Sequence, residues 1–162
     1  YWLFWCMANL GLRVSEAIDV RLKDVRPHLY LDAVVVRTRK KGDAEPRLIP
    51  IYVSVEEIKA LWRMLHEIPP YIPDGRFFPY GIRWVQYHFD YTCALRNLRK
   101  SLHTHSLRHY CGQSLARVAN GRIEIIAERM RHAAPRGLVT FTYVVPSKEE
   151  QIAVITRRPC IY

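Results

Sequence analysis

One short part of this sequence has the pattern of β-strands, and the segments on both sides of it repeat apolar residues at helical spacing. Residues 29–38 include three consecutive valines, residues 48–51 are again mostly apolar, and the turn-prone Lys41-Gly42-Asp43 lies between them. This pattern predicts a β-hairpin. The basic residues near its tip are Arg37, Arg39, Lys40 and Lys41. The expected fold class is therefore mixed α+β, mostly α-helical with a small antiparallel β-sheet.

Helical patterns account for most of the remaining chain. Ser54 is expected to cap an amphipathic helix, with Glu57 at the third helical position as in a capping box. Other helices are expected over residues 1–10, from Ser15, over 81–98, after Thr104 as far as Asn120-Gly121, and over 123–130. No internal repeat or Ser/Gly-rich linker separates these patterns, so residues 1–162 are expected to form a single domain.

The charge of the chain points to an anionic partner. The 162 residues include 25 Lys and Arg against 15 Asp and Glu, which gives a formal net charge of +10, and 19 of the 25 are Arg. The planar guanidinium group binds phosphate in a bidentate way, so nucleic acid is favoured over a membrane surface. A merely soluble basic protein is the alternative. The 49% of hydrophobic residues excludes a disordered chain.

The start of the chain and its cysteines indicate in which cellular compartment the protein is expected. The apolar start is interrupted by Asn9 and reaches Arg13, well short of the roughly 20 apolar residues that cross a bilayer. The four cysteines form no CxxC pair, which argues against a disulfide framework. Because the chain opens at Tyr1, we expect the C-terminal part of a longer cytoplasmic protein, with no membrane contact.

A pair of polar residues opens the helix after Thr104. His105 and Arg108 are three residues apart, so both are expected on one side of the helix, near an N-terminus that favours an anion. A solvated polar face is the simpler interpretation of an isolated pair. A zinc site formed by His103, His105, His109 and Cys111 is disfavoured, because Cys111 belongs to the apolar face and no Glu stands between the two later histidines. No metal or cofactor is expected.

Five motifs occur in a fixed order along the chain. They are Gly11-Leu12-Arg13-Val14-Ser15-Glu16-Ala17, the hairpin lysine, His105-Ser106-Leu107-Arg108-His109, Met130-Arg131-His132, and Thr140-Phe141-Thr142-Tyr143. This order resembles the catalytic domain of the tyrosine recombinases, the phage-integrase and Xer-like family. The resemblance runs from Tyr1 to about Tyr143.

The resemblance implies six catalytic residues. They are Arg13, Lys41, His105, Arg108, His132 and Tyr143. Lys40 is the alternative to Lys41, because neighbouring residues of a regular strand point to opposite faces. Two departures from the family pattern concern the last motifs. Arg131 occupies a position that usually holds Gly, and Phe141 stands where the nucleophile is normally expected, so Tyr143 is assigned that role through a longer preceding loop.

The resemblance also implies an activity. A site-specific recombinase or integrase would cleave and rejoin double-stranded DNA through a covalent 3′-phosphotyrosine, without metal or ATP. Fixed cations suit this chemistry, because the transition state gathers negative charge on the phosphate. A type IB topoisomerase or telomere-resolving enzyme, and a DNA-binding module without catalysis, are the alternatives. A homotetramer on DNA is implied, while the isolated domain is expected to be monomeric.

Residues 144–162 form a tail beyond Tyr143. Ser147 is expected to cap a short helix that ends at Arg157-Arg158-Pro159. So short a helix is unstable alone, so it must pack on its own domain or on a neighbouring protomer. The resemblance favours exchange of this tail between protomers.

Overall fold

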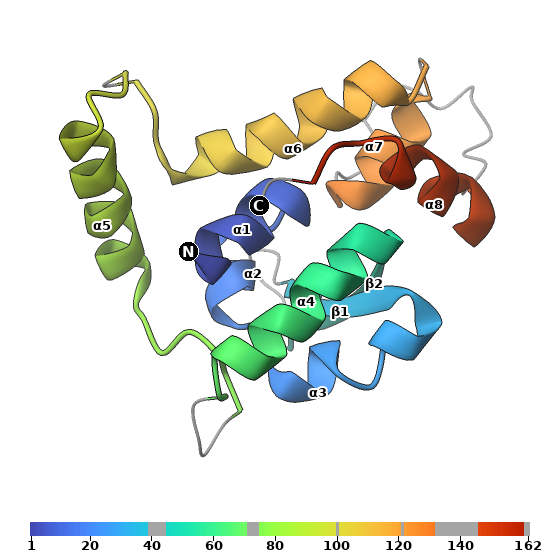
Figure 1. The fold of residues 1–162 in the computed structure, drawn as a ribbon, viewed down its shortest axis with the longest axis horizontal. Helices are drawn as coiled ribbons and strands as arrows, with labels where there is room; N and C mark the ends of the chain where they lie inside the picture. The colour runs from blue at the N-terminus through green and yellow to red at the C-terminus, as the bar shows by residue number, and fades with distance from the viewer. Residues whose placement is uncertain (39–44, 71–74, 100, 121, 132–145, 161–162) are drawn as a thin grey trace.

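The structure is a computed structural model that describes residues 1–38, 45–70, 75–99, 101–120, 122–131 and 146–160. This part of the chain is mostly helical, with one two-stranded antiparallel sheet (Figure 1), which confirms the expected fold class. Its elements in chain order are α1 (Trp2–Asn9), α2 (Val14–Ile18), α3 (Leu22–Val25), the 3-10 turn η1 (Leu29–Leu31), β1 (Ala33–Thr38), β2 (Arg47–Tyr52), α4 (Val55–Glu67), α5 (Ile82–Leu95), α6 (Thr104–Val118), α7 (Ile123–Arg129) and α8 (Lys148–Thr156).

Helix α1 lies in the core of the fold. All of its residues except Phe4 are buried, and α6 packs along it (Figure 1). A helix that is apolar on every side is stable only when other elements cover it completely, which explains this position. The buried N-terminal helix expected from the sequence is confirmed.

The hairpin forms, but its first strand is shorter than expected. β1 and β2 pair antiparallel with Val36 opposite Ile49. The prediction that the strand begins at residue 29 is wrong, because residues 29–31 form η1 and Asp32 has a left-handed φ of 52°. Apolar content alone does not identify a strand, and within this turn only Leu29 is buried, whereas Tyr30 and Leu31 are exposed. The hairpin tip, with Lys40 and Lys41, lies outside the described residues.

Helix α4 begins as the capping box predicts. The Ser54 hydroxyl accepts a hydrogen bond from the Glu57 backbone N–H at 3.3 Å, and the Glu57 carboxylate accepts one from the Ser54 N–H at 3.0 Å. The buried face of the helix carries Leu61 and Met64, which join the same apolar cluster as Val34 of β1. The capping residues therefore fix where the helix starts, and the apolar face fixes how it packs on the sheet.

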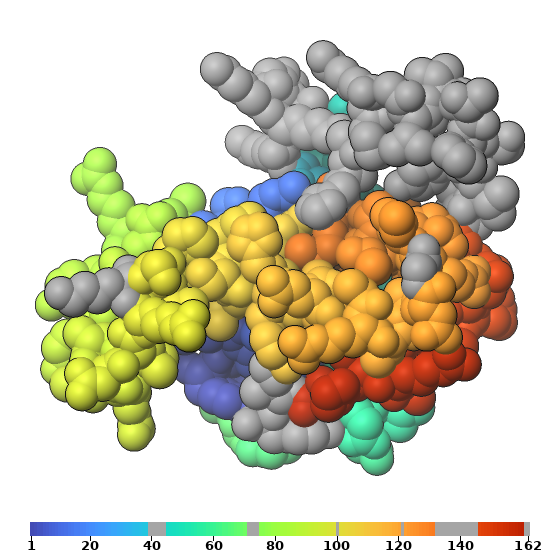
Figure 2. Space-filling view, turned by 90° about the horizontal axis from the view of Figure 1, so that it is seen from above, coloured from blue at the N-terminus to red at the C-terminus, as the bar shows by residue number. Residues whose placement is uncertain are grey.

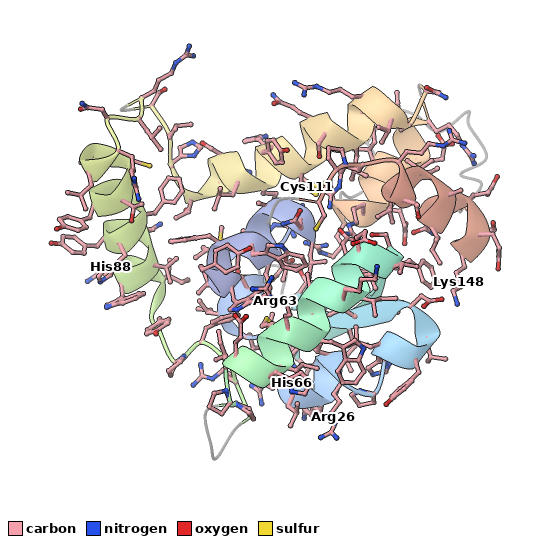
Figure 3. All side chains as sticks on the ribbon, in the orientation of Figure 1. Arg26, Arg63, His66, His88, Cys111 and Lys148 are labelled. Carbon is pink, nitrogen blue, oxygen red and sulfur yellow. The ribbon has the colours of Figure 1, made fainter. Side chains whose placement is uncertain are left out.

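Helix α5 stands away from the rest of the fold (Figure 1). Only Val85, Phe89 and Cys93 are buried among its residues, whereas His88 points outward in Figure 3. The expected helix ended at residue 98, but the chain leaves it after Leu95 and soon adopts a left-handed φ of 51° at Asn97. Most of the surface of α5 is therefore open.

Helices α6, α7 and α8 enclose a second apolar cluster. Its buried members are Cys111, Leu115, Ala119, Ile125, Met130, Val154 and Ile155. Figure 2 shows α6 running across one face, with the C-terminal segment beside it. Tyr110, next to Cys111 on α6, is 37% exposed and stays outside this cluster. The predicted cap of α8 is confirmed, because the Ser147 hydroxyl accepts the Glu150 N–H at 3.2 Å.

A buried ionic cluster joins the C-terminal segment to the core of the same chain. Arg129, at the end of α7, and Arg158, after α8, each place Nη2 2.6 Å from Oε1 of Glu57. The backbone oxygen of Asn9 accepts from the same two nitrogens, at 3.0 and 2.6 Å. We call Glu57, Arg129 and Arg158 the Glu57 cluster. In this single chain the tail packs on its own domain, and its exchange between protomers stays a prediction.

Candidate active site

Three segments that are far apart in the sequence meet beside the C-terminal end of α1. They are the turn that carries Gly11 and Arg13, the first half of α6, and the end of α7. Gly11 has a left-handed φ of 65°, which favours glycine after a helix end. A Cβ atom at this position would also lie 2.9 Å from Sδ of Met130, so the Met130 side chain would have to move to admit another residue.

Arg13 is the most open cation of this site. Its side chain is 41% exposed, and its Nη1 donates to Oε1 of Glu16 at 2.8 Å. Its backbone N–H donates to Oε2 of the same carboxylate, also at 2.8 Å. Glu16 therefore fixes both the backbone and the side chain of Arg13, while part of the guanidinium group faces solvent.

Arg108 is buried, against the expectation that the pair with His105 lies on the open face of α6. Only 1% of the residue is exposed. Its Nη1 donates to the backbone oxygen of Gly11, and its Nη2 donates to that of Met130. Both carbonyl groups stand at helix C-termini, where backbone oxygens lack partners within the helix and carry partial negative charge. The guanidinium turns inward because two helix ends offer it acceptors.

Electrostatics at Arg108 combine burial with like charges. Burial, together with the neighbouring cations Arg131 and Arg13, lowers the pKa of Arg108 to about 10, while Glu16 opposes this shift. Arg108 is therefore still a cation at neutral pH. Its Nη1 lies 3.7 Å from Oε2 of Glu16, beyond hydrogen-bond distance.

His105 is exposed on α6, close to two other imidazoles. Its ring centroid lies 4.6 Å from that of His109 and 6.3 Å from that of His103. Partial burial lowers the pKa of His105, and His109 and Arg108 lower it further through their charges. Its neutral form is therefore favoured at neutral pH, and a neutral imidazole can either accept or donate a proton.

Arg131 belongs to this site although the sequence identified it only as a departure from the family pattern. Its side chain is 2% exposed, and its Nη2 lies 2.6 Å from Oε2 of Glu16 and 2.8 Å from the Gly11 oxygen. We call Arg13, Glu16, Arg108 and Arg131 the Glu16 cluster. An arginine at a position that usually holds glycine was the signal in the sequence that could have found it.

The remaining predicted site residues, Lys41, His132 and Tyr143, lie outside the described residues, as does Phe141. Among the residues that the structure describes, no three histidine, cysteine, aspartate or glutamate side chains are placed to share a metal ion. Cys111 is fully buried between α6 and α1 (Figure 3), and its thiol donates to the Asn9 oxygen at 3.4 Å. This confirms that Cys111 belongs to the apolar face.

No helix in the described residues has both the length and the apolar character needed to span a membrane.

No protein-family profile and no curated protein sequence matches the chain. Several solved structures are similar to it. An integrase from mycobacterium phage Brujita aligns with 99% of this chain at 18% identity, with a TM-score of 0.65, and the chain covers 52% of it.

Two Xer proteins are also similar. XerA recombinase aligns with 94% of this chain at 20% identity and a TM-score of 0.61, and the chain covers 55% of it. The pre-cleavage complex of XerH site-specific recombinase bound to difH substrate aligns with 82% at 19% identity and a TM-score of 0.56, and the chain covers 39% of XerH. The chain thus spans about half the length, or less, of these structures. It has a fold like that of the tyrosine recombinases and integrases.

Proposed function

We propose that this protein is a site-specific tyrosine recombinase or integrase that cleaves and rejoins double-stranded DNA. The observation that carries the proposal is the Glu16 cluster, in which Arg13 and Arg108 share one carboxylate although they come from two separate motifs. His105 is exposed three residues before Arg108 on α6, and partial burial, His109 and the charges of Arg108 and Arg13 lower its pKa. Three groups suited to a phosphate therefore meet at one place.

The proposed reaction is an in-line displacement at phosphorus. The phenolic oxygen of Tyr143 attacks the scissile phosphate, the bond from phosphorus to the 5′ oxygen breaks, and a 3′-phosphotyrosine forms. Arg13 and Arg108 stabilise the negative charge of the transition state. A phenol has a pKa near 10, so His105 or His132 takes its proton as the attack proceeds. Lys41 gives a proton to the departing 5′ oxygen, and the reverse reaction rejoins the strand.

DNA is the proposed partner for reasons of charge and shape. The chain has a net charge of +10, and XerH site-specific recombinase was solved bound to its difH substrate. The open surface at α5 carries aromatic rings: Tyr80, just before the helix, stacks on Trp84 with centroids 4.0 Å apart, and the tilted rings of Trp84 and His88 have centroids 3.8 Å apart. Arg83 is also exposed on this helix. An exposed helix with basic and aromatic side chains fits against DNA. We propose that four copies of the protein assemble on the DNA.

The test of this function is formation of a covalent adduct. The protein is incubated in EDTA with a nicked suicide substrate, and adducts that survive SDS are separated on a gel. We expect an adduct with the wild type and none with Tyr143→Phe, because phenylalanine has no nucleophilic oxygen. Tyr110→Phe, at an exposed tyrosine of α6, should leave the adduct unchanged. An adduct in Tyr143→Phe would refute the assignment, and DNA binding without any adduct would identify a non-catalytic module.

The cations can be tested in the same assay. Arg13→Ala should slow adduct formation by about 10² to 10³, the usual effect of losing one donor to the transition state. Arg63→Ala removes the same charge from the far helix α4, where the side chain is 66% exposed, and should leave the rate nearly unchanged. Equal losses in the two variants would mean that Arg13 acts only through net charge.

A further inference from the structure

Arg131 adopts a backbone conformation that its residue type disfavours. Its φ is 49°, in the left-handed region, directly after the C-cap residue Met130 of α7. A non-glycine residue here is strained, and such strain persists where the surrounding structure holds it in place. The contacts of the Arg131 side chain provide that restraint, because it donates to Glu16, to the Gly11 oxygen and, at 2.8 Å, to the Arg129 oxygen.

Arg131 and Arg108 face the same two acceptors, the Gly11 oxygen and Glu16, but their distances to Glu16 differ. Both donate to the Gly11 oxygen, and both face Oε2 of Glu16. Arg131 Nη2 lies 2.6 Å from that carboxylate oxygen, whereas Arg108 Nη1 lies 3.7 Å from it. Arg131 therefore takes the close ionic contact with Glu16, and Arg108 is held mainly by two neutral carbonyl groups.

The charge of the cluster follows from these contacts. Three guanidinium groups surround one carboxylate, because Arg13, Arg108 and Arg131 all lie within 4 Å of Glu16. An anion at the exposed part of Arg13 therefore meets an excess of positive charge. Without Arg131, that excess would be smaller, and Glu16 would attract Arg108 and Arg13 more strongly.

We propose that Arg131 is a positioning residue for DNA cleavage: it balances Glu16, so that Arg13 and Arg108 keep their positive charge for the scissile phosphate. This inference rests on the proposed function. Arg131 cannot contact DNA itself, since its side chain is 2% exposed, and the equally buried Arg108 acts on the phosphate through its charge. Any effect of the residue on phosphate binding must therefore pass through its neighbours in the Glu16 cluster.

The test compares Arg131→Met, Arg131→Gly and Arg131→Lys. The first measurement is the single-turnover rate constant of cleavage at saturating DNA, corrected for the folded fraction. We expect a fall of about tenfold or more for Met, within the range for residues that orient ligand-binding groups. Arg131→Gly should cleave equally slowly, although glycine relieves the backbone strain of the left-handed φ. Lys restores the charge and should recover most of the lost rate.

The second measurement is the salt dependence of DNA affinity, which reports how many phosphates the protein neutralises. The slope of log K against log salt is negative, and Arg131→Met should reduce its magnitude by about 1, as if one phosphate contact were lost. Arg129→Met is the matched control, because it also removes a buried arginine two residues away but belongs to the Glu57 cluster. It should reduce stability without changing the slope or the corrected rate constant.

These outcomes separate the inference from the proposed function. If the wild type forms no adduct, the proposed function fails, and the salt slope alone decides whether Arg131 supplies charge to the phosphate site. If a folded Arg131→Met or Arg131→Gly protein keeps the wild-type rate and slope, Arg131 is a structural ion pair and the inference is wrong. The inference is also wrong if Arg129→Met loses as much of the corrected rate constant and of the salt slope as Arg131→Met does.

Discussion

Glu57→Gln is expected to destabilise the fold strongly, because Glu57 balances two arginines in the core. The Glu57 carboxylate is 1% exposed, and the Arg129 and Arg158 side chains are each 2% exposed. Removing one partner of a buried ion pair costs about 3 to 5 kcal/mol, since a charge stays buried without compensation. Here the amide of glutamine keeps an acceptor for one arginine, so we expect about 3 kcal/mol.

That loss is a large fraction of the stability of a typical domain, which is about 5 to 15 kcal/mol. Urea unfolding followed by circular dichroism measures it. With an m-value of about 2 kcal/mol per molar urea, the midpoint should fall by about 1.5 M without a change in slope. A lower slope would instead indicate that the tail has detached in the native state.

Glu56→Gln is the matched control on the same turn of α4. Glu56 pairs with Lys59 at 2.9 Å, but both side chains are more than half exposed, so the midpoint should hardly move. If Glu57→Gln shifts the midpoint no more than Glu56→Gln does, Glu57 does not carry the stability assigned to it. The arginines of the Glu57 cluster would then be compensated by other groups.

Three further predictions concern the site. Although burial raises the pKa of Glu16, the Arg131 and Arg13 contacts lower it to about 2 from an ordinary 4.5. Its contribution, about 3 kcal/mol, should therefore be complete above pH 4.5 and disappear as the pH falls toward 2, which acid unfolding of the wild type will show. Gly11→Ala adds a Cβ at a left-handed φ, 2.9 Å from Met130 Sδ, and should lower the Tm by about 5 °C in calorimetry. Lys41→Ala should fail to cleave ordinary DNA but should cleave DNA with a 5′-thiolate leaving group, which needs no general acid. The same rescue in Lys40→Ala instead would assign the role to Lys40.

Local signals in the sequence predicted the helix starts well. Ser54 with Glu57 and Ser147 with Glu150 both form capping boxes in the structure, because each box involves only four neighbouring residues. The ends of elements were predicted less well. Residues 29–31 look like part of a strand in the sequence but form η1, in which only Leu29 is buried, so their apolar character did not mark a buried strand.

The candidate site could be predicted only as a list of residues. Helical spacing placed His105 and Arg108 on one side of α6, but it could not show that Arg108 turns inward to the Gly11 and Met130 carbonyls. Those acceptors exist only once α1 and α7 have packed against α6. The same holds for Arg131, whose partner Glu16 lies in a distant motif and becomes its neighbour only in the folded chain.

The two ionic clusters meet at the C-terminal end of α1. Arg129 and Arg131 are two residues apart, yet the first binds Glu57 and the second binds Glu16. The Asn9 oxygen accepts from the Glu57 cluster, and the Gly11 oxygen accepts from the Glu16 cluster. Helix C-termini present carbonyl groups without partners and carry partial negative charge, so one helix end can hold arginines on both sides. Because α1 is buried in the core, its end is a fixed point, and the position of the candidate catalytic arginines depends on the same packing that stabilises the fold.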